Sequence, residues 1–63
     1  MIVTDMFNNN PGTQKLGLTA EEVVLGGVLP DGSCLVEVHT NHGDAMKYKF
    51  QYNNGKATLD LLP

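Results

Sequence analysis

Cysteine and histidine are the side chains in this sequence best suited to nucleophilic or metal chemistry, and the chain has one Cys and two His. Cys34 would need a base beside it to act as a nucleophile. Successive side chains along a strand point to opposite faces, so a strand through both positions separates Cys34 from His39. A thiol among apolar neighbours is inert. We therefore expect Cys34 to pack in a core.

Two histidines and an aspartate, His39, His42 and Asp44, lie close together in the sequence. Two imidazoles and one carboxylate are enough ligands for a zinc site with an open position. These residues surround a turn, however, and no residue is evident that would orient the imidazole rings. Turn geometry already accounts for Asn41, Gly43 and Asp44. We expect neither a metal ion nor another cofactor.

A row of polar residues is the third candidate. Lys47, Lys49 and Gln51 alternate along one strand and would share a face. The aromatic residues between them point to the other face, and the net charge is −3, so nucleic-acid binding is not expected. Acidic residues should lie opposite the lysines as Glu37–Lys47 and Lys49–Asp60 pairs. The candidate binding residues are Glu37, His39, Lys47, Lys49, Gln51 and Asp60.

Three turn signals set the elements that carry these side chains: Asp31-Gly32, Asn41-His42-Gly43 and Asn54-Gly55. Asp-Gly and Asn-Gly favour two-residue type I′ hairpins, because both central positions need a positive φ. The middle signal fits a three-residue loop with its glycine in the left-handed conformation of a bulge. The sequence therefore predicts a mainly β fold, an antiparallel meander of four strands at about 22–29, 33–40, 44–53 and 56–62.

These loop lengths place the apolar residues of all four strands on one face. A slip of one residue would turn a whole strand over, so the pattern specifies the register. The face opposite should be polar, and the sheet either stays open or curls into a small open barrel. The expected partners across the three turns are, in chain order, Leu29 with Cys34, Val38 with Met46, and Tyr52 with Ala57.

The amino-terminal third should cover the apolar face. Residues 2–7 alternate weakly and predict a fifth strand, and the segment up to Leu18 would complete a lid. Thr19 and Glu22 have the spacing of a capping box, so the alternative is an α+β fold with a short helix at about 20–25. Strand is favoured there because it extends the first hairpin in register. Gly26-Gly27 should introduce a bulge or bend.

Length and composition predict one small domain, residues 1–63. A chain of this size buries only about 60% of its unfolded surface, and a single cysteine allows no internal disulfide. Cover by a protein partner or by self-association is therefore expected. The amino terminus has neither a basic region nor a long apolar core, which predicts a cytoplasmic protein without a membrane span.

The functional hypotheses follow from what is absent as well as present. No phosphate-binding loop, nucleophile elbow or close carboxylate pair is evident, so we do not expect an enzyme. The leading hypothesis is a non-enzymatic protein-binding module, such as a small phage-type inhibitor or accessory factor that blocks a surface of a larger host protein or adds to it as a sheet edge. The alternatives are a self-assembling structural subunit, and a weak metal- or nucleic-acid-binding protein that uses His39, His42 and the Lys47/Lys49 face.

Overall fold

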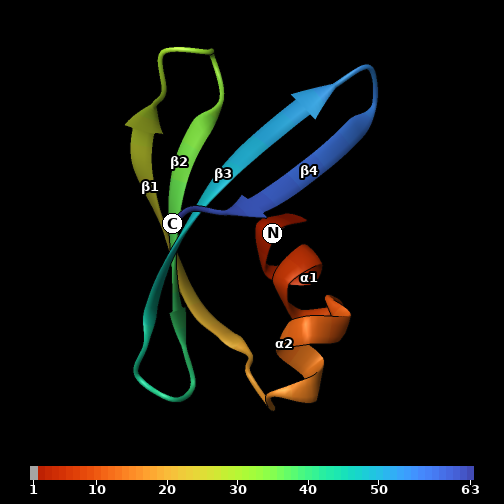
Figure 1. Cartoon of the computed structure of the whole chain (residues 1–63), viewed down its shortest axis with the longest axis vertical. Helices are drawn as coiled ribbons and strands as arrows, with labels where there is room; N and C mark the ends of the chain where they lie inside the picture. Colours follow the sequence, from red (N-terminus) through yellow and green to blue (C-terminus); the bar gives the residue numbers. More distant parts are fainter. Residues whose placement is uncertain (1) are drawn as a thin grey trace.

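The computed structural model describes residues 2–63 and confirms the meander. One antiparallel sheet has the strand order β1-β2-β3-β4, and two short helices lie across one of its faces (Figure 1). The sheet is open, with β1 and β4 at its edges. The elements are α1 (Ile2–Asn8), α2 (Pro11–Lys15), β1 (Ala20–Val28), β2 (Cys34–Thr40), β3 (Ala45–Asn53) and β4 (Lys56–Leu61).

The second and third hairpins have the predicted registers. Asn54 and Gly55 have φ angles of 51° and 78°, as a type I′ turn requires. Gly43 has a φ of 86°, and its N–H donates to the Thr40 carbonyl at 3.0 Å. The expected partners Val38 with Met46 and Tyr52 with Ala57 are confirmed.

The first hairpin differs from the prediction of a two-residue turn at Asp31-Gly32. The Gly32 N–H donates to the Leu29 carbonyl at 2.9 Å, and the Leu29 N–H donates to the Ser33 carbonyl at 2.7 Å. The loop therefore contains three residues, Pro30, Asp31 and Gly32, and only the glycine has a positive φ. Pro30 explains the difference, because its fixed φ suits the second position of a type I turn.

Strand β1 has a bulge at Gly26-Gly27, as predicted. The register shifts between Leu25 and Gly27, and Gly27 has a φ of 117°. The three-residue loop already pairs Cys34 with Val28 and not with Leu29 as expected, and beyond the bulge Leu25 is paired with Val36. Val28 moves from the expected polar face to the face of Cys34. A second shift lies between Ala20 and Glu22.

The amino-terminal segment is a lid, as predicted, but it is helical rather than a fifth strand. Val3 and Phe7 are buried one helical turn apart on α1. Residues 2–7 contain apolar residues on both sides of Thr4 and Asp5. So short a pattern fits a period of 2 or 3.6 almost equally well, so alternation alone was a weak signal. The α+β alternative correctly included a short helix, but the helix lies at the amino terminus, and residues 20–25 belong to β1.

The five-residue helix α2 is held at both ends by its caps. The Asn10 side chain accepts hydrogen bonds from the backbone N–H groups of Gly12 at 2.8 Å and Thr13 at 3.2 Å, and Pro11 occupies the first turn. At the other end, Leu18 N–H donates to the Thr13 carbonyl at 3.0 Å, beside a glycine with positive φ. The cluster of turn-forming residues at 8–12 thus starts a helix as well as ending one.

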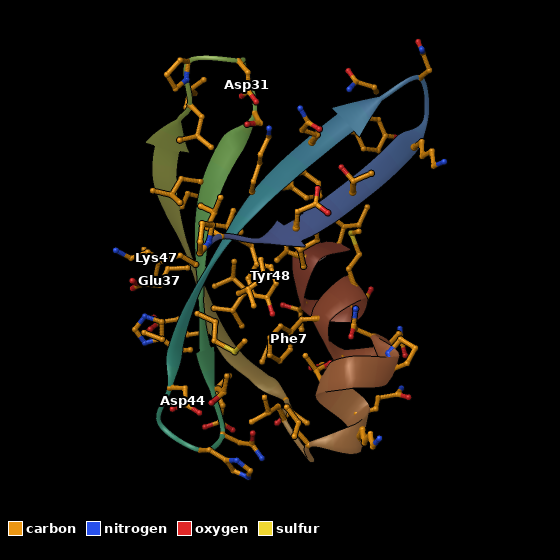
Figure 2. All side chains as sticks on the ribbon, viewed as in Figure 1. Phe7, Asp31, Glu37, Asp44, Lys47 and Tyr48 are labelled. Carbon is orange, nitrogen blue, oxygen red and sulfur yellow. The ribbon has the colours of Figure 1, made fainter. Side chains whose placement is uncertain are left out.

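The core lies between the lid and one half of the sheet. Val36, Val38 and Tyr48 are buried on the face that the helices cover, and Phe7 meets Tyr48 edge-on with ring centroids 5.9 Å apart (Figure 2). Burial raises the pKa of Tyr48 above its ordinary value of 10.0. This aromatic pair joins the lid to the centre of the sheet.

We predict that Phe7→Ala releases the lid. The Phe7 side chain is 1% exposed, and removing a buried Phe costs about 3–5 kcal/mol. A domain of 63 residues has a total free energy of unfolding of roughly 3–9 kcal/mol. Thermal denaturation followed by circular dichroism should therefore show a large fall in Tm or no folded state. Leu16→Ala, at an exposed position of the same lid, should leave Tm nearly unchanged, and an equal fall in both variants would contradict this account.

Candidate functional site

The six predicted binding residues lie on one face of the sheet, opposite the helices. Register pairs Glu37 with Lys47, and Lys49 with Asp60, and side-chain alternation puts His39 and Gln51 on the same face. We call this the outer face. Figure 2 shows Glu37 and Lys47 projecting on the side away from Phe7.

The ion pairs on the outer face differ from those predicted from cross-strand positions. Within residues 2–63, Glu37 bonds to His39 on its own strand, with 2.7 Å between Oε2 and Nε2. Lys49 reaches the loop between β1 and β2, where its Nζ lies 2.5 Å from Asp31 Oδ2. A long side chain can contact a residue that is not its cross-strand neighbour. The strand register therefore predicted which residues are paired across the strands, but not which side chains form ion pairs.

Asp31 also takes part in the ion pairs of this region, although its place in the sequence predicted only a turn. Its carboxylate accepts hydrogen bonds from the Ser33 N–H at 3.0 Å and the Ser33 hydroxyl at 2.5 Å. The hydrogen bond from Lys49, followed by those from Ser33, holds the pKa of Asp31 well below its ordinary value of 3.8. The Asp-x-Ser spacing was the available signal, because Asp side chains bond to the backbone two residues on.

The helix-facing side of the sheet is only partly covered, and this leaves an apolar surface. Figure 1 shows both helices over one end of the sheet, while the first and third hairpin loops project beyond them. Leu25 and Val28 are 72% and 75% exposed. Register places Val28 beside Cys34, and Cys34 beside Phe50. We call this surface the uncovered patch: the exposed Leu25, Val28 and Tyr52 together with the half-buried Cys34 and Phe50.

A hollow of about 250 Å³ lies at the end of this patch, lined by residues 31–34 and 50–53. It exists because β2 begins at Cys34, opposite Phe50, whereas β3 continues to Asn53. The loop that carries Asp31 and β3 therefore form two walls without a strand between them. Apolar rings and polar amide and carboxylate groups line the same hollow, a mixture that suits recognition of a protein segment.

The candidate metal and nucleophilic groups are not brought together. Within residues 2–63 no group of three His, Cys, Asp or Glu side chains is placed to hold a metal ion. The Asp44 backbone is engaged by Thr40, whose N–H donates to the Asp44 carbonyl at 2.9 Å. Cys34 and His39 lie on opposite faces of β2, as expected, so they form no dyad.

Comparison with known proteins adds no relative, because no family model, curated protein or solved structure matches the chain. Between residues 2 and 63 the structure contains no helix long and apolar enough to cross a membrane.

We predict that Lys49→Met raises the pKa of Asp31 toward 3.8, because it removes the largest cause of the depression. A depressed pKa in the folded state contributes stability that is complete above the ordinary pKa and is lost as pH falls toward the folded-state pKa. The variant should therefore lose less stability than the parent chain below about pH 4. Carbon-13 NMR titration of the carboxyl groups measures the pKa, and acid denaturation measures the stability.

Lys47→Met is the matched control, since Lys47 lies on the same strand and face but forms no ion pair within residues 2–63. It should leave the titration of Asp31 unchanged. An unaltered Asp31 pKa in the Lys49 variant would show that the loop does not depend on this ion pair.

Proposed function

We propose that this protein is a non-enzymatic protein-binding module that engages its partner through the uncovered patch. The observation that carries the proposal is the exposure of Leu25 and Val28 beside a hollow on a face whose other half forms the core. Clustered apolar side chains with a polar rim are typical of protein interaction sites. Asp31 and Gln51 supply such a rim at the hollow.

More specifically, we propose that the protein is an inhibitor or accessory factor, such as those that phages encode, and that it acts by covering a surface of a larger protein. A small sheet with one apolar end suits steric blocking, because blocking a surface needs no catalytic group. The acidic net charge of −3 favours a partner surface with basic residues around an apolar centre.

The other functional hypotheses have less support. The lid already buries Tyr48, so the aromatic face is not free as a whole for self-assembly. His39 and Lys49 are engaged by Glu37 and Asp31, which reduces what they can offer a metal ion or a phosphate. The aromatic rings lie on the face opposite the lysines, where they cannot stack on the bases of the same nucleic acid.

Leu25→Asp and Val24→Asp form a matched pair of variants for testing the patch. These neighbours are both exposed, and register places Leu25 beside Val36 on the helix-facing side and Val24 beside Glu37 on the outer face. We predict that Leu25→Asp abolishes capture of the partner, because an unpaired charge would be buried at the interface, whereas Val24→Asp retains it.

The measurement is affinity purification of each tagged variant from the cells in which the protein is made, with mass spectrometry of the captured proteins. Circular dichroism confirms that both variants are folded. Capture of the same proteins by both variants would rule out the patch, and capture of none by the parent chain would count against a protein-binding role.

A further inference from the structure

The two free edges of the sheet differ in regularity. The ladder between β1 and β2 has two register shifts, and bulges of this kind make an edge a poor template for another strand. β4 pairs with β3 from Lys56 to Leu61 without a shift. The outer edge of β4 is therefore the regular one, and its tip projects away from the helices (Figure 1).

The hydrogen-bonding groups on the outer edge of β4 follow from its pairing with β3. In an antiparallel ladder, alternate residues turn both backbone groups toward the same neighbouring strand. The Leu62 N–H donates to the Lys47 carbonyl at 2.9 Å. The backbone N–H and C=O groups of Leu62, and of every second residue before it, therefore point toward β3. The backbone groups of Ala57, Leu59 and Leu61 consequently point outward, where they are free to pair with another strand.

The charges of β4 are complementary to those of the same strand running in the opposite direction. Lys56 and Asp60 lie on the outer face at equal distances along the chain from Thr58. We propose that β4 pairs antiparallel with β4 of a second copy of this chain about a two-fold axis at Thr58. Each lysine then lies opposite the aspartate of the other copy, and backbone hydrogen bonds join Ala57 to Leu59 in both directions.

Thr58 gives independent support for this register. Its hydroxyl is buried and is the only such side-chain atom without a hydrogen-bond partner within residues 2–63. At the two-fold axis the two Thr58 residues form a non-hydrogen-bonded pair, the position at which side chains of neighbouring strands come closest. Rotation about χ1 directs each hydroxyl to the other, as in the Thr–Thr pairs common across strands. The dimer thus supplies the partner that the single chain lacks.

This register is distinguishable from its neighbours. A shift of one residue would place the helix-facing side chains of one copy beside the outer-face side chains of the other. A two-fold axis at Leu59 would keep the faces but set Thr58 against Asp60 and leave Lys56 opposite Leu62. Only the axis at Thr58 pairs both charges, and it joins two four-stranded sheets into one continuous sheet.

The test is a charge exchange measured by sedimentation equilibrium across the micromolar range at low salt, where exposed charges are least screened. Lys56→Asp and Asp60→Lys each place like charges opposite each other twice and should weaken the dimer roughly tenfold. The double variant K56D/D60K restores opposite charges and should return the dissociation constant to within about threefold of the parent value. Glu21→Lys, on the β1 edge, should have no effect.

Thr58→Val adds a readout that charge does not affect. It removes the buried hydroxyl that lacks a partner, so the monomer should gain stability while dimer formation weakens. A parent chain that stays monomeric throughout the range overturns the proposal. So does a double variant that fails to recover, or an equal loss on Glu21→Lys. Leu25→Asp should not change dimer formation, which separates this edge from the proposed partner surface.

Discussion

The packing of a short helical lid on one half of a one-sided sheet is the constraint on which the rest of the structure depends. A seven-residue helix such as α1 is about 10 Å long, whereas a nine-residue strand such as β3 is about 30 Å long. The lid therefore cannot reach both ends of the sheet. Phe7 fixes it against Tyr48, and the apolar residues beyond that contact stay exposed. The core and the uncovered patch are two halves of the same face.

Polar contacts determine which half is covered. The Asn41 side chain accepts a hydrogen bond from the Thr19 N–H at 2.9 Å and donates one to the Gly17 carbonyl at 3.2 Å. The Asn8 side chain accepts one from the Ala20 N–H at 2.8 Å. These bonds hold the connector at the end of the sheet where β2 turns into β3. The lid is thus positioned next to the middle hairpin loop, and the end of the sheet that carries Asp31 is left without helical cover.

Turn chemistry made most of the sheet predictable from sequence, and its limits explain the errors. Gly43 and Gly55 occupy positions that need positive φ, so the loop lengths and registers beside them followed directly. Pro30 lies next to an equally strong Asp-Gly signal and changes the loop length, which the dipeptide alone does not reveal. The face of each outer-face residue was predictable from alternation. The Asp31–Lys49 contact was not, because it depends on how a loop curls toward a long side chain in another hairpin.

The free edges of β1 and β4 are protected in different ways against pairing with strands of other proteins. β1 is protected by its bulges and by adjacent glutamates at its start. β4 has no bulge, and its protection consists of one positive and one negative side chain on the outer face. When most other strands pair with β4, at least one of these two charges has no opposite charge facing it. An antiparallel copy of β4 is different, because its lysine and aspartate have the same spacing in reverse order. In the proposed dimer, the charges that exclude foreign strands are therefore the ones that admit a second copy.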